Sequence, residues 1–241
     1  MTDEKIDSGK NDFDKGVELF LLETEKLGED DKKIRELYLK SFRASADKGY
    51  LSGKVLAACL TTNDSNPYMG FTVKEFIEIK NRVDSGSGSA EDYRNMALCY
   101  EYDLPIVKLM DSYRQDPEKH IMDYLQNALS NGDLIALHKR AQRNIGLLPA
   151  MDAGSLPAII KCLEDENFKS MLTEKGLEYY TTIRISLENK RNTYLSENIS
   201  SNTGLPASIG NFLATTHDKP DIAPSDQKLL TKTFGNNTFS Y

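Results

Sequence analysis

The stretch SADKGYLSGKVLA, residues 45 to 57, decides the fold class of this 241-residue chain. Its glycines and lysine invite comparison with a phosphate-binding loop, which needs G-x-x-x-x-G-K-[ST] after a buried strand. The interval from Gly49 to Lys54 is one residue too short for that motif, Val55 follows the lysine, and the preceding segment has helical periodicity. The stretch therefore predicts a turn between two packed helices.

Two further segments share the pattern when the chain is aligned on glycine, namely ALSNGDLIA at 128–136 and AMDAGSLPA at 150–158. In all three, a small residue stands four positions before the glycine, leucine stands two after it, and another small residue stands four after it. A glycine can adopt the left-handed conformation that ends a helix, and small residues let two helices approach closely. We expect structural turns at Gly49, Gly132 and Gly154.

Apolar residues recur at helical spacing from Phe13 to Tyr194, and alternating strand patterns are scarce. This periodicity predicts an all-α protein with more than half of its residues in helices and almost no strand. Thr72 and Glu75 form a capping-box pattern at the start of one helix. A longer helix is expected over about residues 167–194.

These features resemble the Sel1-like repeat, a relative of the tetratricopeptide repeat. The residues that carry the resemblance are Ala46, Gly49 and Leu51, then Ala128, Gly132, Leu134 and Ala136, and finally Ala150, Gly154, Leu156 and Ala158. DYRNMALCYEY at 92–102 looks like the first helix of such a repeat, and PEKHIMDYLQNALSNGD at 117–133 looks like the second helix and its turn. The resemblance implies a short helical-repeat solenoid that binds other proteins. Its unequal glycine intervals imply an irregular one.

The chain divides into three parts by composition. Residues 1–11 are expected to be a flexible N-terminus, 12–194 a helical-repeat domain, and 195–241 an extended or partly disordered tail with few apolar residues. The segment DSGSGS at 84–89 predicts a hinge within the domain.

The charge balance limits the classes of partner. The chain carries 37 acidic and 30 basic residues, a net charge of -7. Nucleic acid and anionic lipid need a basic surface, so we expect a protein partner, preferably a basic one, and no nucleic acid or membrane. The three cysteines, Cys59, Cys99 and Cys162, lie among apolar residues and predict buried thiols. No signal peptide or membrane span is evident, which favours a cytoplasmic protein, or a periplasmic one if a leader has been removed.

Tyrosine and arginine side chains often form the centres of interfaces. They gather after the predicted hinge, where we expect a partner-binding set of Tyr93, Arg94, Tyr100, Glu101 and Tyr102. An alternative is that Tyr93 and Tyr100, seven residues apart on one helix face, belong to the core. The basic run HKRAQR at 138–143 is a further candidate contact surface.

Few residues suggest chemistry, and the sequence predicts no cofactor and no metal site. His120 with Asp123, the acidic runs at 29–31 and 164–166, and His138 are the candidates for acid-base catalysis. Solvated helix surfaces and helix caps explain the exposed candidates more simply. The sequence therefore favours a non-enzymatic protein-interaction module, in one specific form a toxin-neutralising immunity protein that masks a basic effector. The alternative is an enzyme built from scattered carboxylates and His120 or His138.

Overall fold

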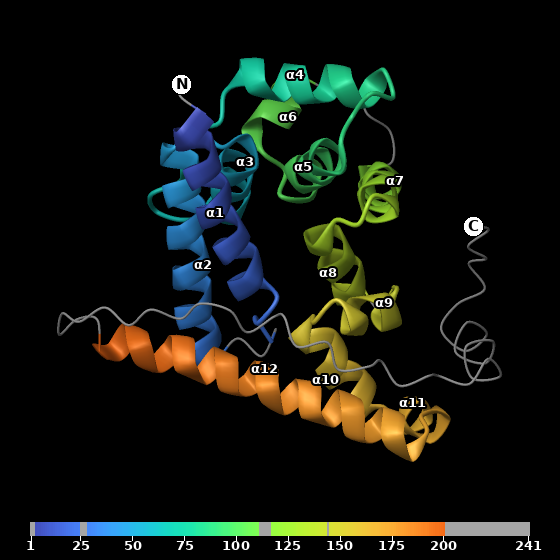
Figure 1. Cartoon of the computed structure of the whole chain (residues 1–241). Helices are drawn as coiled ribbons and strands as arrows, with labels where there is room; N and C mark the ends of the chain where they lie inside the picture. The colour runs from blue at the N-terminus through green and yellow to red at the C-terminus, as the bar shows by residue number, and fades with distance from the viewer. Residues whose placement is uncertain (1–2, 25–27, 111–116, 144, 201–241) are drawn as a thin grey trace.

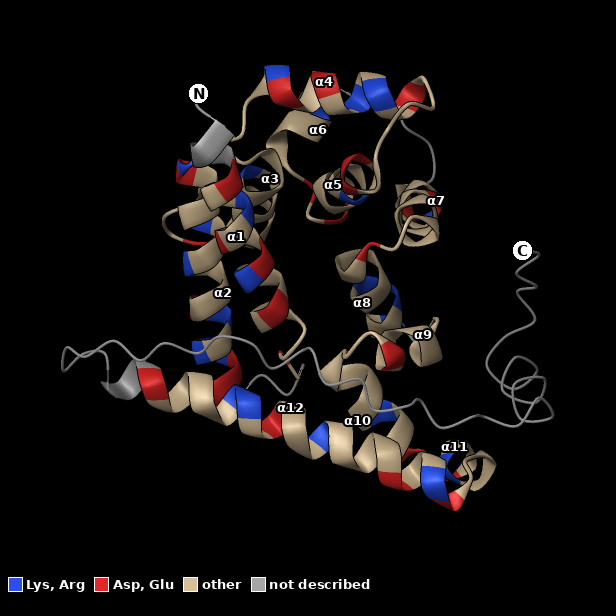
Figure 2. Cartoon of the chain, viewed as in Figure 1, with Lys and Arg blue, Asp and Glu red and all other residues tan. Residues whose placement is uncertain are grey.

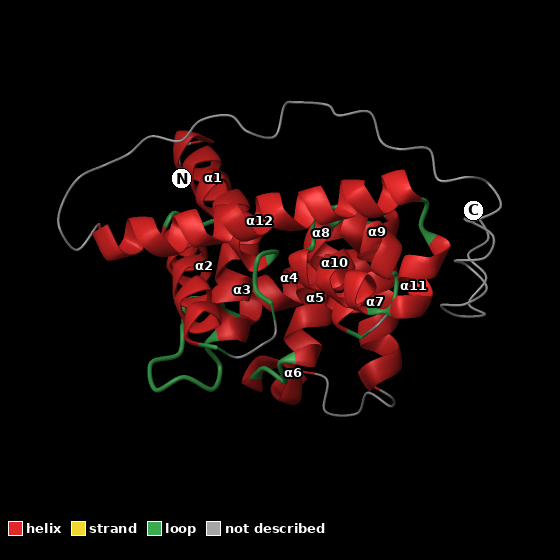
Figure 3. Ribbon diagram, turned by 90° about the horizontal axis from the view of Figure 1, so that it is seen from below, coloured by secondary structure: helices red, strands yellow, loops and turns green. Residues whose placement is uncertain are grey.

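The computed structural model describes residues 3–24, 28–110, 117–143 and 145–200. Within these ranges every regular element is a helix, which confirms the predicted all-helical fold class (Figure 3). The helices of the described chain are α1 (Asp3–Phe20), α2 (Glu29–Asp47), α3 (Leu51–Leu60), α4 (Val73–Asp84), α5 (Ala90–Glu101), α6 (Pro105–Met110), α7 (Pro117–Ser130), α8 (Leu134–Gln142), α9 (Leu147–Asp152), α10 (Leu156–Glu164), α11 (Glu166–Met171) and α12 (Glu174–Ser200). None of these described helices has the length and apolar character needed to span a membrane.

Most of the helices pack in chain order into an inner and an outer layer (Figure 1). The inner layer consists of α3, α5, α8 and α10, whose side chains are buried on almost every side. In the outer layer, α2 packs on α3, α4 and α7 pack on α5, and α9 packs on α8 and α10. A helix buried all round needs small or apolar residues on all of its faces, and sequences such as LSGKVLAACL meet that condition.

The three predicted turn glycines connect an outer helix to the next inner helix, and all have positive φ. The values are 90° at Gly49, 81° at Gly132 and 82° at Gly154. At each turn the glycine N–H donates to the carbonyl three residues earlier, and the following N–H donates to the carbonyl five residues earlier. The small residue of the sequence pattern, for example Ala128, supplies this last carbonyl, at 3.2 Å from Asp133 N. This is the hydrogen-bond pattern of a Schellman helix end.

Two more helix ends have the same hydrogen bonds, centred on Gly86 (φ 73°) and Asp103 (φ 48°). The first lies inside the segment 84–89, for which the sequence predicted a hinge. There Ser89 and Asp92 form a capping box at the start of α5, and Arg82 pairs with Asp92 at 2.6 Å. The structure thus has a hydrogen-bonded helix joint at this place, equivalent to the three that were predicted.

Substitution of Gly132 by valine should destabilise the fold by about 1–2 kcal/mol. A side chain at this position would meet no atom within 4 Å, so the cost comes from the left-handed backbone alone. Gly132→Asn is the matched control, because asparagine tolerates this conformation better. Urea unfolding should rank the proteins wild type, Gly132→Asn, Gly132→Val in falling stability. Equal stability of the asparagine and valine variants would contradict the backbone explanation.

The ends of the chain differ from the sequence prediction. Residues 3–11, expected to be flexible, form the first half of α1, and residues 195–200 of the predicted tail continue α12. The rest of the predicted tail, 201–241, lies outside the described residues. The single helix expected over 167–194 is two helices, because the backbone is extended at Leu172 and Thr173 Oγ1 accepts from Gly176 N at the start of α12.

The first helix reaches across the molecule. α1 packs on α2 and α3, and its C-terminal end contacts α8 and α10. The Phe20 ring lies 4.9 Å from the His138 ring, and Leu156 N donates to Leu21 O at 3.1 Å. Nearer the middle of α1, the Phe13 ring lies 5.0 Å from the Arg94 guanidinium of α5. The inner side of the helix array is therefore covered by the chain's own N-terminal helix.

The last helix joins the two hydrophobic cores. Tyr180, Ile183 and Leu187 of α12 pack on the smaller core formed by α8 to α11, whereas Tyr194 and Leu195 pack on the larger core formed by α1 to α8. At the contact with the larger core, side chains of opposite charge also meet. Figure 2 shows the basic segment of α12 against the acidic start of α2, where Arg191 NH2 donates to Asp31 Oδ1 at 2.9 Å. Lys190 and Tyr194 both bond Glu18 of α1.

Candidate functional site

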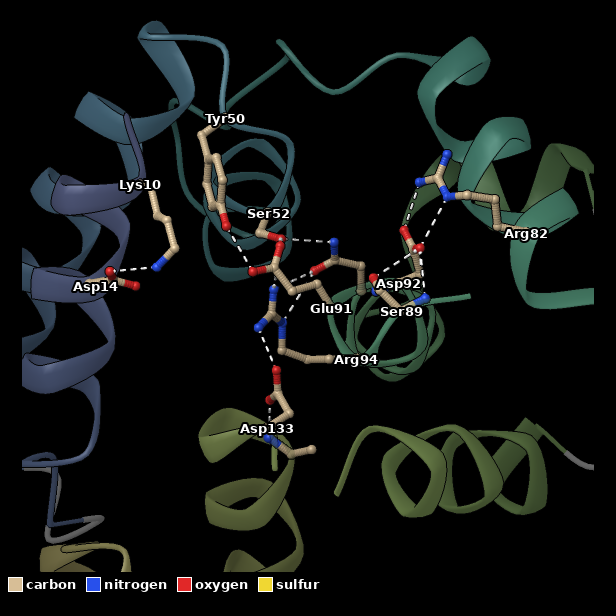
Figure 4. A network of polar contacts seen from close by, with 12 residues as sticks. Lys10, Asp14, Tyr50, Ser52, Arg82, Ser89, Glu91, Asp92, Arg94 and Asp133 are labelled. Carbon is tan, nitrogen blue, oxygen red and sulfur yellow. Dashed lines mark hydrogen bonds and ion pairs between the residues drawn. The ribbon is translucent and has the colours of Figure 1, made fainter. Parts of the chain in front are cut away.

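A chain of polar side chains crosses the inner layer from α3 through α5 to α8 (Figure 4). At its lower end Arg94 NH1 donates to Asp133 Oδ2 at 2.6 Å, and the same arginine donates to Asn95 Oδ1. The side chains of Arg94 and Asp133 are only 3% and 6% exposed. Asp133 Oδ1 also accepts from Ala136 N, which caps α8. One carboxylate thus satisfies both a buried guanidinium and a helix N-terminus.

At its upper end the chain reaches Glu91, which accepts from Tyr50 OH and from Ser52 Oγ, both at 2.7 Å. Asn95 Nδ2 donates to Ser52 Oγ at 3.1 Å and so connects the two ends. Burial, followed by the Glu91 carboxylate, raises the pKa of Tyr50. Because these groups satisfy one another, the network holds α3, α5 and α8 in register.

The next pair of inner helices makes a related contact. Arg94 is the fifth residue after the N-cap Ser89 of α5, and it reaches the N-cap Asp133 of α8. His138 is the fifth residue after Asp133, and its Nδ1 lies 3.0 Å from Oγ of Ser155, the N-cap of α10. The same position of two successive inner helices therefore contacts the start of the following inner helix.

His138 is fully buried. Burial, assisted by Lys139 and Lys161, lowers the pKa of His138 to about 3. Its other neighbours are Gln142, whose Nε2 lies 3.3 Å from Nε2 of the histidine, and the Phe20 ring. The contact with Ser155 is buried on both sides, so it lacks the access to solvent that a nucleophile and its base need.

The lowered pKa of His138 predicts acid sensitivity. The unfolded chain binds a proton near pH 6.5 and the folded chain does not, so the stability contributed by neutral His138 is complete above pH 6.5 and falls as the pH drops toward 3. From pH 6.5 to 5 the free energy of unfolding should fall by about 2 kcal/mol through this group. Urea titrations should show a shallower pH dependence for His138→Gln than for wild type or His120→Gln. Equal slopes in all three proteins would contradict this assignment.

A second polar cluster brings together two sequence segments that were singled out separately, 100–102 and 138–143. Glu101 Oε1 accepts from Lys139 Nζ at 3.2 Å and from Arg143 NH2 at 3.1 Å, and Lys139 Nζ also donates to Tyr102 OH at 3.1 Å. Although burial acts to lower it, Tyr102 and Glu101 raise the pKa of Lys139. Glu118 of α7 pairs with Arg143 at 3.3 Å. This Glu101 cluster links α5 to α8 and α7.

Beside this cluster lies a cavity of about 480 Å³ between the end of α3, the end of α5 and the start of α6. It is lined by Thr62, Asn63, Glu101, Tyr102, Asp103, Pro105 and Lys108. A second cavity of about 430 Å³ lies over α2, lined by Glu36, Leu39, Lys40, Arg43, Ala44, Asp47 and Asp64. Only the first contains residues of the predicted partner-binding set.

That predicted set is split by the structure. Arg94 and Tyr100 are buried, so they are not part of an exposed surface, and Tyr93 is half-buried with its ring 6.5 Å from Tyr124. The alternative prediction, that Tyr93 and Tyr100 belong to the core, is therefore correct for Tyr100. Of this set, Glu101 and Tyr102 line the cavity of about 480 Å³. The burial of Arg94 follows from α1, which covers it with Phe13.

The candidates for acid-base chemistry lie apart. Asp31 of the 29–31 run is bound by Thr24 and Arg191, and Asp165 of the 164–166 run caps α11. The half-buried His120 has its ring 6.4 Å from Tyr124. All three cysteines are free and buried. In the part of the chain that the structure describes, no group of three or more His, Cys, Asp or Glu side chains could hold a metal ion.

Sequence reasoning missed the network residues Ser52, Glu91, Asn95 and Asp133. A local signal existed for Asp133, because it directly follows a turn glycine and precedes an apolar helix, where aspartate is a preferred N-cap. A similar signal, serine followed three positions later by aspartate, marked the start of α5 at Ser89. No local signal identifies Ser52, Glu91 or Asn95, since each depends on a helix distant in sequence.

With this geometry established, comparison with known proteins adds no relative: no family model, no curated protein and no solved structure matches the chain.

Proposed function

We propose that this protein is a non-enzymatic protein-interaction module built as a short, irregular helical solenoid of the Sel1-like or tetratricopeptide-like kind. The observation that carries the proposal is the serial packing of inner and outer helices through joints with one hydrogen-bond pattern. The repeated contact from Arg94 to Asp133 and from His138 to Ser155 supports it. Such arrays present extended surfaces and are commonly used for binding.

The residues most able to do chemistry have structural roles that fit this proposal better than catalysis. His138 is buried and held neutral between helices, Asp133 caps α8, and Asp165 caps α11. Both cavities are open to solvent and lined largely by charged and polar side chains, whereas a catalytic pocket usually encloses its substrate.

The partner should bind outside the inner face, because α1 fills that face. The best candidate for the partner-binding surface is the region around the Glu101 cluster and its cavity. This region combines the half-buried Tyr102, charged side chains of both signs and a cavity. Interfaces favour such a combination of a partly buried aromatic anchor and a polar rim.

The net charge of -7 favours a basic partner and speeds its encounter with the protein. A toxin-neutralising immunity protein is one specific form of this proposal. An acidic binder without chemistry of its own suits the masking of a basic effector, an argument from charge and analogy.

Site-specific photo-crosslinking tests the proposed function. A photoreactive amino acid placed at Asn63 or Lys108, beside the cavity, should capture one dominant protein from extracts of the source cell. The same amino acid at Lys175, at the exposed start of α12, should not. Two results together would contradict the proposed function. These are equal or absent capture at all three positions and stabilisation of the protein by a small metabolite in a thermal-shift screen. They would favour an enzyme or a ligand-binding protein over an interaction module.

A further inference from the structure

We propose that the second half of α12, residues 188–200, is a displaceable strap. When the strap lifts, the surface beneath it, at the end of α1 and the start of α2, binds a basic segment of a partner protein. We call this surface the acidic end and define it by Glu18, Asp30 and Asp31. The inference gives the proposed interaction module a second docking surface, so it rests on the proposed function.

Apolar contacts fix the first half of α12 more firmly than the strap. Tyr180 is 2% exposed and packs with the half-buried Ile183 and Leu187 on the smaller core. Among the described side chains of the strap, only Leu195 is buried. Burial of apolar area supplies most of the free energy that holds a helix against its neighbours. The strap therefore depends more on its polar contacts than the first half of α12 does.

The polar contacts of the strap place two cations in partly buried positions. Arg191 NH2 donates to Asp31 Oδ1 at 2.9 Å. Lys190 and Tyr194 both bond Glu18. The Arg191 side chain is 14% exposed and its Nε is buried without a hydrogen-bond partner among the described residues, and burial lowers the pKa of Lys190. Because the desolvation of both cations offsets much of their attraction to the carboxylates, the contact can open at small cost.

The acidic end does not need the strap to keep its geometry. Asp31 also accepts from Thr24 N at 3.0 Å and from Thr24 Oγ1 at 2.8 Å. It stands with Glu29 and Asp30 in the first turn of α2, where the helix dipole favours carboxylates. Lifting of the strap therefore leaves an oriented carboxylate beside an acidic helix start (Figure 2).

The strap itself shows which chemistry the acidic end accepts. It presents two adjacent cations, Lys190 and Arg191, followed by Tyr194 and Leu195 one helical turn later. A partner segment with the same arrangement can make the same contacts, and the net charge of -7 attracts it from solution. The partner and the strap compete for one surface, so the closed strap inhibits binding.

Amide hydrogen exchange in the full chain tests the strap. Lys190→Glu places a carboxylate against Glu18 and should speed exchange of the Tyr194 amide about tenfold, whereas the Tyr180 amide should change less than about twofold. Helix ends fray in any protein, so the evidence lies in the dependence of exchange on this charge.

Two further variants separate the ion pair from a general effect on the helix. Asn189→Glu adds a carboxylate at an exposed neighbouring position and should speed exchange of the Tyr194 amide less than about twofold. Glu18→Lys combined with Lys190→Glu restores an opposite-charge pair and should bring the rate to within about threefold of wild type.

A peptide titration tests the acidic end. The probe is acetyl-LENKRNTYLSEN-amide, which copies residues 187–198, and its analogue has glutamine in place of both cations. Followed by the backbone amide signals of Glu29 and Asp30, the probe should bind the Lys190→Glu variant saturably. It should bind wild type about tenfold more weakly, because the open fraction limits the apparent affinity. The analogue should bind the variant at least about threefold more weakly than the probe does.

The strap is overturned if Lys190→Glu leaves exchange of the Tyr194 amide unchanged, if Asn189→Glu speeds it equally, or if Glu18→Lys fails to restore it. Absent binding of the probe to the Lys190→Glu variant, or equal binding of the analogue, overturns the docking surface. Either result, combined with selective photo-crosslinking at Asn63, leaves the interaction module in place. Loss of that selective crosslinking instead removes the proposed function itself.

Discussion

Replacing Asp133 by alanine should lower the free energy of unfolding by about 4 kcal/mol. The substitution removes the N-cap of α8 and takes from the buried Arg94 guanidinium its hydrogen-bonded carboxylate, leaving only Glu91 Oε2 at 3.9 Å from NH2. Loss of a cap costs about 1 kcal/mol, and removal of one partner of a buried ion pair costs about 3–5 kcal/mol. For a folded region of this size the melting temperature should fall by roughly 10 °C.

Asp14→Ala is the matched control, because it also removes one aspartate from an ion pair. Its partner Lys10 lies 2.7 Å away, but the two side chains are 53% and 54% exposed, so the change should cost less than about 0.5 kcal/mol. Asp133→Asn keeps a capping side chain and removes the charge, so it should lie between the two. If Asp133→Ala and Asp14→Ala had equal stability in urea unfolding, the Arg94 network would not hold the inner helices together.

The second large effect is expected at Phe20, where alanine should cost about 3–5 kcal/mol. The ring is 2% exposed and lies 5.3 Å from Tyr38 and 4.9 Å from His138, so it connects the first helices to α8. Its removal should also admit water beside the imidazole. The pKa of His138 should then rise from about 3 toward its usual value of 6.5, and the Leu156 amide should exchange faster, because its hydrogen bond to Leu21 O depends on the same contact.

Phe76→Ala provides the comparison, since Phe76 is equally buried but lies in α4, away from α8 (Figure 1). It should lose similar stability without a shift in the pKa of His138, as measured by histidine NMR titration. An unshifted pKa of His138 in Phe20→Ala would show that α1 does not shield His138 and that other contacts join the first helices to α8.

Much of the fold follows from local patterns. Helices were predicted from apolar periodicity, the start of α4 from its capping box, and the left-handed backbone at Gly49, Gly132 and Gly154 from a recurrent pattern around glycine. These predictions succeed because helix ends and turns depend on residues within about six positions of one another. The joint at Gly86 was missed, since glycine and serine in 84–89 have the composition of a linker, although the capping box after them is local as well.

The candidate site was less predictable. Glu101 and Tyr102 were expected to contact a partner and Lys139 lay in a basic run, yet their meeting beside one cavity depends on the packing of α5 against α7 and of α7 against α8.

By itself, the sequence determined that this protein is helical and where several of its helices turn, because the energies that fix those features are local. Only the tertiary structure decided that Arg94 and Tyr100 are interior, that α1 covers the inner face, and that α12 spans both cores. These outcomes depend on contacts between segments as far apart as Glu18 and Lys190. Contacts over such distances depend on how whole helices pack against one another and not on neighbouring residues, which is why no local pattern shows that Arg94 meets Phe13 of the first helix and not solvent.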